Sequence, residues 1–227
     1  MPLFKKAKKK YRVGELNSNC SEPETDKWVI SDFVVSNLIP EVGTRPFPLD
    51  ELMLMVSAVV YFKPEVIFEW GTHVGKSARV FYETIKAFDI PCNIHSVDLP
   101  PDALHTEHPK EKHGMLVKNI KEVHLHRGDG VLKSLEIYKS MGTSKKTLFL
   151  IDGDHSYESV LRELTMVVNE VKDPVILLHD TFYQSPESKY NIGPYKAIVD
   201  CFKGKQGDYK IISTQMGLPG MTLVYKK

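Results

Sequence analysis

Five carboxylates stand out in this sequence because each follows a short apolar run. They are Glu69, Asp98, Asp129, Asp152 and Asp180. If the apolar runs are parallel strands, their carboxyl ends meet at one edge of a sheet, where α/β proteins bind ligands. Each acid taken alone could instead cap a helix. Several carboxylates at one edge repel each other, so together they indicate a cation or a cationic ligand.

The first of these acids opens a turn that leads into a helical pattern. Glu69 is followed by Gly71 and Gly75, with three residues between the glycines. That spacing is one residue shorter than in a phosphate-binding P-loop. His73 occupies the position at which a dinucleotide turn needs its second glycine, so close approach of a pyrophosphate is disfavoured. A ligand without phosphate suits this turn better, and an ordinary strand-to-helix turn is the alternative.

A second polar group lies further along the chain. Residues 152–155 read Asp-Gly-Asp-His, and His179-Asp180 ends a later apolar run. Aspartate oxygens are ligands that Mg²⁺ prefers. A divalent cation lowers the pKa of a bound hydroxyl, and a nearby histidine can then take its proton. Residues of these types could serve proton transfer or hold a metal ion if the fold brings them together.

Alternating strands and helices must position these residues. The pattern predicts strands at 66–69, 93–98, 123–127, 147–151, 175–178, 209–213 and 221–225, and helices at 49–62, 77–88, 131–141, 156–172 and 194–202. Continuously apolar strands are typical of parallel sheets covered on both faces. We therefore expect an α/β, Rossmann-like, doubly wound fold. Its seven-stranded, mostly parallel sheet would carry helices on both faces and end in a C-terminal antiparallel hairpin.

The first 45 residues differ in composition from the rest. Residues 1–45 hold proline, asparagine and charge, which predicts an irregular N-terminal extension before a domain at 46–227. The basic run from Lys5 to Arg12 is expected to be a solvated tail.

Composition limits the classes of partner and compartment. A chain of 227 residues can bury one sizeable core, and a formal net charge of +1 gives no electrostatic reason to expect nucleic acid. No apolar run approaches the length of a membrane span, so no membrane partner is expected. Three scattered cysteines suggest reduced thiols in a cytoplasmic protein. A homo-oligomer is compatible with the sequence.

The motifs taken together resemble a known enzyme family. From about Leu49 to the C-terminus, the chain is similar to class I methyltransferases that use S-adenosylmethionine (SAM). Two segments narrow the resemblance: Ile-Asp-Gly-Asp-His-Ser-Tyr-Glu-Ser-Val at 151–160 and Leu-Leu-His-Asp-Thr at 177–181. They resemble metal-dependent O-methyltransferases related to cephalosporin hydroxylase and to the rhamnosyl and macrolide sugar O-methyltransferases. The resemblance implies methyl transfer from SAM to a hydroxyl of a small molecule or sugar.

It also implies roles for individual residues. The methionyl part of SAM would lie against Glu69, Gly71, Thr72, Gly75 and Ser77. Asp98 would bind the ribose hydroxyls, and Asp129 would lie near the adenine. Asp152 and His155 would be catalytic, with His155 as the general base. Asp152 and Asp180 would hold a divalent metal, expected to be Mg²⁺.

One position departs from the pattern of that family. Relatives carry Glu-Asp where this chain has His179-Asp180. A neutral imidazole can ligate metal, but it leaves Mn²⁺, Zn²⁺ or no metal open beside Mg²⁺, and Asp154 could supply a further oxygen. The alternative is that His179 supports the site or caps a helix. The loop at 183–195 would overhang the strand ends as an acceptor lid, or it is a plain connection.

Other interpretations and other histidines have to be weighed as well. A nucleotide-binding α/β protein without methyl transfer, either an oxidoreductase or a regulatory module, is the rival function. A third possibility keeps the fold and SAM but has lost catalysis. Two sets of histidines are predicted to lie outside the site. A surface loop is expected to hold His105, His108 and His113, together with Glu107. A face of the sheet is expected to hold His95, His124 and His126.

Overall fold

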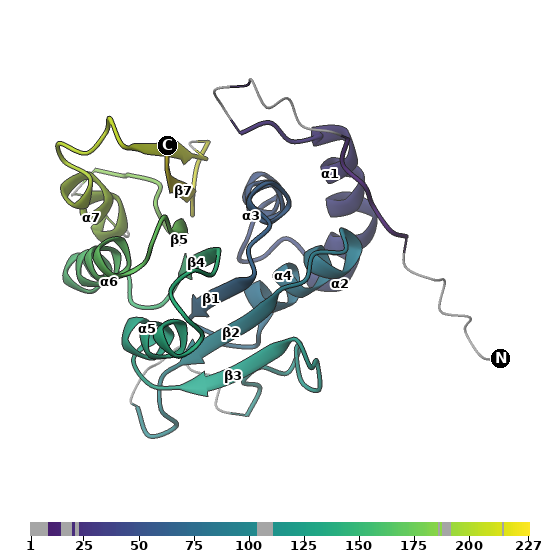
Figure 1. Cartoon of the computed structure of the whole chain (residues 1–227), viewed down its shortest axis with the longest axis horizontal. Helices are drawn as coiled ribbons and strands as arrows, with labels where there is room; N and C mark the ends of the chain where they lie inside the picture. Colours follow the sequence, from purple (N-terminus) through teal and green to yellow (C-terminus); the bar gives the residue numbers. More distant parts are fainter. Residues whose placement is uncertain are drawn as a thin grey trace.

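A computed structural model of the chain describes residues 9–14, 20, 23–103, 111–185, 187, 192–214 and 216–227. Within these residues seven strands form one sheet, in the order β3-β2-β1-β4-β5-β7-β6 (Figure 1). The strands are β1 Val66–Trp70, β2 Asn93–Asp98, β3 Val123–Arg127, β4 Thr147–Ile151, β5 Val175–His179, β6 Tyr209–Ser213 and β7 Met221–Lys226. Strands β1 to β5 are parallel, and β7 is antiparallel to both β5 and β6. The predicted mostly parallel sheet with a closing hairpin is confirmed.

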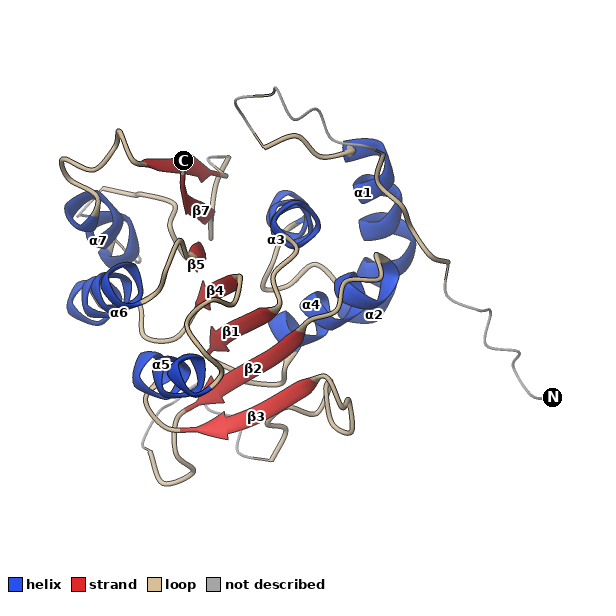
Figure 2. Ribbon diagram, viewed as in Figure 1, coloured by secondary structure: helices blue, strands red, loops and turns tan. Residues whose placement is uncertain are grey.

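Helices cover both faces of the sheet (Figure 2). On one side lie the α-helices α1 Lys27–Phe33, α2 Ile39–Val42, α3 Leu49–Phe62 and α4 Lys76–Ala87, together with a π-helical segment, η1 Val34–Leu38. On the other side lie α5 Gly130–Ser140, α6 Tyr157–Glu170 and α7 Gly193–Cys201. None of the helices among the described residues is long and apolar enough to cross a membrane.

The alternation of side chains along each strand explains why both faces are apolar. In β1, Phe68 and Trp70 pack into the core beneath α5, α6 and α7, whereas Ile67 belongs to the core beneath α3 and α4. Successive strand residues point to opposite faces, so a strand covered on both sides needs apolar residues at nearly every position.

The N-terminal segment departs from the prediction of an irregular extension. Residues 27–42 are helical, and Ile30, Phe33 and Leu38 are fully buried against α3 and α4. Their spacing of three to five residues puts them on one helical face. Asp26 caps the first helix by accepting a hydrogen bond from the Val29 backbone N–H at 3.1 Å. The expectation of irregular structure is wrong here because apolar burial outweighs the local prolines and polar residues.

The described part of the basic run is also anchored. The ring of Tyr11 is buried and contacts the rings of Phe33 and Phe88. Lys9 pairs with Asp32 at 2.6 Å, and residues 1–8 lie outside the described part of the chain. Residues 9–12 are therefore a strap on the core, which corrects the expected solvated tail for these residues.

Candidate active site

The strand-end acids form two adjoining groups at the carboxyl edge of the sheet. The β1–β2 group consists of Glu69, Gly71, Thr72, Gly75, Ser77, Ser96 and Asp98. The β4–β5 group consists of Asp152, His155, His179 and Asp180. Strand order reverses between β1 and β4, and such a point is where α/β sheets bind their ligands.

Glu69 is the buried centre of the β1–β2 group. Its Oε1 accepts a hydrogen bond from the Ser96 hydroxyl, whose oxygen lies 2.6 Å from that of Thr72. Its Oε2 is buried and has no close hydrogen-bond partner among the described residues, although the Ser77 hydroxyl also acts on the carboxyl group and opposes the rise of its pKa. Burial raises the pKa of Glu69 to about 7. The carboxyl group therefore has one buried oxygen available for a donor or cation brought by a ligand.

Both glycines of the turn are required by the backbone. Gly71 has a φ of +92°, and a Cβ built there would lie 2.0 Å from the backbone oxygen of Asp152. Gly75 has a φ of +87° at the start of α4, and a Cβ there would lie 2.9 Å from a methyl carbon of Val117. Only glycine adopts such conformations without strain, so the turn can lie close against the end of β4.

Asp98 lies at the end of β2 among hydrogen-bond donors. Its Oδ1 accepts from the Leu99 N–H at 2.8 Å, and its Oδ2 accepts from the His73 N–H at 3.1 Å. The Nε2 atom of His113 lies 3.2 Å from the same Oδ2.

His113 was not expected at this site. The surface-loop interpretation is wrong for His113, whose side chain is largely buried against Asp98. The chain beyond it hydrogen-bonds to the glycine turn, from Gly114 N–H to His73 O and from Leu116 N–H to Val74 O. That docking is a tertiary contact, and no local signal reveals it. His105, Glu107 and His108 lie outside the described residues.

Asp129 and Asp154 both serve helix starts. Asp129 is the N-cap of α5, with Oδ1 accepting from the Leu132 N–H, and its Oδ2 pairs with Arg162 at 2.6 Å. Asp154 accepts hydrogen bonds from the hydroxyls of Ser156 and Ser159 ahead of α6. The adenine contact of Asp129 stays a prediction. Asp154 directs its oxygens to α6 and not to β5, so nothing here supports it as an extra metal ligand.

The β4–β5 group brings two carboxylates and two imidazoles together. His155 Nε2 lies 3.2 Å from Asp180 Oδ2 and 3.6 Å from Asp152 Oδ1. Asp180 has a φ of +55°, an uncommon conformation for a non-glycine residue that often accompanies functional sites. The side chain of His155 is partly exposed, so the ring can meet a molecule that enters from solvent.

His179 is held between carboxylates on both sides of its ring. Its Nδ1 lies 3.0 Å from Asp152 Oδ1 and 3.4 Å from Asp180 Oδ2. Its Nε2 lies 3.1 Å from Glu51 Oε2, contributed by α3. Glu51 was not predicted from the sequence, because nothing marks an acid within an apolar helix as the partner of a residue 128 positions later.

The imidazoles and carboxylates of the β4–β5 group shift each other's pKa values. Burial alone would lower the pKa of His179, but Asp152, Asp180 and Glu51 raise it well above the ordinary value. Burial alone would raise the pKa of Asp152, but His179 and His155 lower it to about 2. The pKa of His155 is also raised, because Asp152 and Asp180 outweigh its burial. Each acid is thus kept ionised by a neighbouring imidazole.

The predicted metal ligands do lie together. One ligand atom from each of Asp152, His179 and Asp180 lies within 4.8 Å of the others. The two carboxylates suit a hard cation. The Nδ1 atom of His179 faces both of them, and its Nε2 faces Glu51, as the second nitrogen of a metal-bound imidazole commonly faces a carboxylate. The three-residue ligand set stays a prediction.

Comparison with known proteins decides the family. A protein-family profile described as "Methyltransferase domain" matches residues 68–181, which include both groups of the site. The chain belongs to this methyltransferase family. The resemblance to SAM-dependent methyltransferases is thereby confirmed. A search of curated proteins finds no significant match.

Solved structures share the fold of this methyltransferase at low identity. An O-methyltransferase of Bacillus cereus in complex with SAH (S-adenosylhomocysteine) is 12% identical with a TM-score of 0.57, covering 92% of this chain and 94% of that one. The O-methyltransferase TomG of Streptomyces achromogenes, in complex with SAM, is 13% identical with a TM-score of 0.58, covering 88% and 89%. CalS11, a TDP-rhamnose 3'-O-methyltransferase, is 16% identical with a TM-score of 0.55, covering 86% of each chain.

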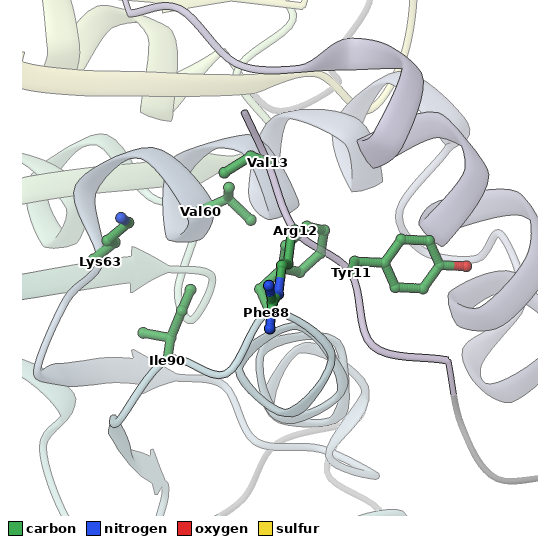
Figure 3. A pocket seen from close by; sticks show the side chains of 7 residues that line it. All are labelled: Tyr11, Arg12, Val13, Val60, Lys63, Phe88 and Ile90. Carbon is green, nitrogen blue, oxygen red and sulfur yellow. The ribbon is translucent and has the colours of Figure 1, made fainter. Parts of the chain in front are cut away.

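A cavity of about 210 Å³ lies at the other end of the methyltransferase sheet (Figure 3). It is lined by Tyr11, Arg12, Val13, Val60, Lys63, Phe88 and Ile90. Lys63 and Ile90 precede β1 and β2, so this cavity lies at the amino ends of the strands, away from the carboxyl-edge site.

The histidines of β2 and β3 lie on the sheet face, as predicted. His95 Nδ1 lies 2.9 Å from His126 Nε2, and the His95 ring stacks on Phe68 and His124. Burial lowers the pKa of His95 to about 4, so the ring is neutral near pH 7. These rings belong to the packing of the sheet and not to the methyltransferase site.

Proposed function

We propose that this methyltransferase transfers the methyl group of SAM to a hydroxyl of a small molecule or sugar. The observation that carries the proposal is the position of His155. Its Nε2 lies beside Asp152 and Asp180, at the carboxyl edge shared with the glycine turn. A base at that position can serve an acceptor bound next to SAM.

The β1–β2 group suits the two ends of SAM. The buried, unpartnered Oε2 of Glu69 is an acceptor for the ammonium of the methionyl part. The turn between Gly71 and Gly75 has no side chain at either glycine to block that part. The Asp98 carboxylate at the end of β2 can accept hydrogen bonds from the ribose hydroxyls in exchange for its present donors.

The reaction requires a hydroxyl to be made nucleophilic. Bound SAM supplies an electrophilic methyl carbon attached to a sulfonium. The neutral His155 ring accepts the hydroxyl proton at Nδ1, the nitrogen that does not face the carboxylates, while the oxygen bonds to that carbon and the carbon–sulfur electron pair returns to sulfur. The neighbouring carboxylates raise the pKa of His155, so its neutral form is a stronger base than an isolated imidazole. Asp180, 3.2 Å away, orients the ring.

Metal assistance was expected from the resemblance. Asp152, Asp180 and the Nδ1 atom of His179 would hold a divalent cation, because their ligand atoms lie within 4.8 Å of one another. When bound, such a cation would lower the pKa of the acceptor hydroxyl.

A sugar-like acceptor is supported by aromatic side chains near the site. The rings of Tyr183, three residues beyond Asp180, and Tyr195 of α7 lie 4.7 Å apart, and both are exposed. The start of α7 packs against the backbone of His155 at Gly193. This pair belongs to the expected acceptor lid, although residues 186 and 188–191 lie outside the described part. CalS11, which shares the fold, is named for action on TDP-rhamnose.

A paired assay tests the proposal. Methyl transfer from SAM would be measured with TDP-rhamnose and with simple catechols as acceptors, followed by the release of SAH. We expect Asp180→Ala to abolish transfer on whichever acceptor the wild type uses, while its affinity for SAM stays within about threefold, because Asp180 belongs to the β4–β5 group. Transfer to amines but to no hydroxyl would contradict O-methylation. Full activity of Asp180→Ala would contradict the assigned site.

A further inference from the structure

The cavity of about 210 Å³ at the amino ends of the strands has no part in the proposed methyl transfer (Figure 3). Its walls are mostly apolar. They include Val13, next to the strap of residues 9–12, Val60 of α3, and Phe88 and Ile90, which follow α4. A water molecule takes up about 30 Å³ in the liquid, so the cavity has room for a small organic molecule.

The N-terminal strap forms one wall of this cavity and is fixed to the core. The Tyr11 backbone N–H donates to the Ala87 carbonyl oxygen at 2.9 Å, and the Tyr11 hydroxyl donates to Asn37 Oδ1 at 2.7 Å. The Lys10 ammonium donates to the Lys86 carbonyl oxygen at 2.8 Å. These bonds join the strap to α4 and to η1, so hydrogen-bonded structure encloses the cavity on that side.

Two cationic side chains line the cavity from opposite sides. Figure 3 shows Arg12 on one side and Lys63 on the other, with Val60 and Ile90 between them. Arg12 belongs to the strap, and Lys63 is the residue that ends α3. A guanidinium can form two parallel hydrogen bonds with one carboxylate, and an ammonium adds a point charge. Apolar walls between two cations therefore suit a molecule with an apolar body and a negative charge.

The charges of Arg12 and Lys63 are not taken up by acids of the fold. Among the described residues neither side chain forms an ion pair. The acids next to the lining residues pair with other lysines: Asp89 with Lys10 at 3.1 Å, and Glu65 with Lys145 at 2.7 Å. A cation at the C-terminal end of α3 is favourable in itself. That accounts for Lys63 but not for Arg12 or for the apolar walls.

We propose that this cavity binds a small organic carboxylate with an apolar body. The carboxylate pairs with Arg12, and Lys63 adds to the positive potential at the cavity. The apolar body lies against Val60, Phe88 and Ile90, which removes apolar surface from water. The bound molecule joins the strap to the end of α3 and to the segment after α4. Binding is non-covalent and separate from the carboxyl-edge site.

The first test titrates three probes into the labelled full chain and follows its amide ¹H–¹⁵N shifts. The probes are 4-phenylbutyrate, its neutral isostere 4-phenylbutanamide, and acetate, which has the charge without the apolar body. We expect 4-phenylbutyrate to give saturable shifts at residues 12–13, 60–63 and 88–90 with a Kd below about 1 mM, and the other two to bind at least tenfold more weakly. Equal binding of the amide or of acetate would overturn the proposal. Shifts confined to the carboxyl edge, or none that saturate up to about 10 mM, would also overturn it.

The second test removes the two charges. In the double variant Arg12→Gln and Lys63→Gln, affinity for 4-phenylbutyrate should fall at least tenfold, to that of the amide. The matched control is the double variant Lys27→Gln and Lys203→Gln, which removes two exposed lysines that do not line the cavity. It should bind 4-phenylbutyrate as the wild type does. Unchanged affinity in folded Arg12→Gln and Lys63→Gln would overturn the role of the cations.

The third test separates this cavity from the methyl-transfer site. SAM would be titrated calorimetrically into the wild type with and without saturating 4-phenylbutyrate. We expect the affinity for SAM to change by less than about twofold, because the two sites lie at opposite ends of the strands. Competition between SAM and 4-phenylbutyrate would overturn the assignment to this cavity. Failure to bind SAM at all would defeat the proposed function and leave the cavity untouched, so the two claims fail separately.

Discussion

The β1–β2 and β4–β5 groups handle buried acids in opposite ways. Glu69 is buried without a cationic partner, and its burial raises its pKa to about 7. Asp152 is also buried, but His179 and His155 hold its pKa at about 2. The β1–β2 group thus has no cationic side chain beside its buried acid, and a ligand can supply the positive charge. In the β4–β5 group the imidazoles of His155 and His179 lie beside the buried acids.

The two groups also differ in the sequence separation of the residues that form them. The β1–β2 group comes from one turn and the adjacent strand, all within residues 69–98. The β4–β5 group depends on Glu51, 128 residues before His179. Local motifs can therefore specify the side that we assign to SAM, while the side that we assign to the acceptor is completed by tertiary contacts.

The comparison predicts its largest effect for a residue of the β4–β5 group. Replacing His155 with Ala removes the proposed base, so turnover should fall about 10²- to 10⁴-fold while SAM affinity is unchanged. Calorimetry with SAM and an assay of SAH release measure the two quantities. His124→Ala, an exposed histidine of β3, is the control and should leave both unchanged. A comparable loss of SAM affinity in His155→Ala would mean that SAM binding and proton transfer are not separated between the two groups.

The second prediction concerns the point where the two groups touch. In Gly71→Ala the new methyl would clash with the Asp152 backbone, so the free energy of unfolding should fall by about 2–5 kcal/mol and SAM affinity should fall with it. Gly142→Ala is the matched control, because Gly142 has a similar φ of +86° but no atom within 4 Å of the new methyl. Urea unfolding of both variants separates the clash from the backbone cost. Equal losses would show that close contact between the groups is unimportant.

The sequence predicted most of the sheet, and physical reasons explain what it missed. The ranges of β2, β3 and β4 agree residue for residue, since β4 is a continuous apolar run and β2 and β3 alternate apolar and polar residues. The helices at 27–42 were missed because polar residues and Pro40 obscure the buried face of Ile30, Phe33 and Leu38. His113 and Glu51 reach the site only through long-range packing, which no window of sequence encodes.

The third prediction concerns the pH dependence of stability without SAM. The pKa of Glu69 is raised to about 7 in the folded protein, against an ordinary value near 4.5. Its contribution to stability is fully present below pH 4.5 and is lost as the pH rises through 7, by up to about 3 kcal/mol. Glu69→Gln cannot ionise, so it should gain that amount relative to the wild type between pH 4.5 and 8. Urea unfolding across that range measures the difference, and a constant difference would refute the raised pKa.

The smallest effect is expected at the end of β2. Asp98→Asn keeps the shape of the side chain but removes the charge, so SAM affinity should weaken by about 10- to 100-fold and the stability change should be small. Asp173→Asn, an exposed acid paired with Lys226, is the control and should leave SAM affinity unchanged. Calorimetric titration measures both variants. If Asp98→Asn binds SAM as tightly as the wild type, the ribose does not lie at Asp98.

The most direct measurement is a calorimetric titration of SAM into the folded wild-type chain. The buried free oxygen of Glu69, the glycine turn and Asp98 together predict saturable binding at one site per chain, weakened by Glu69→Gln. Saturable binding that depends on Glu69 is the result that the structure predicts. A folded protein that takes up no SAM would contradict the proposed methyl transfer.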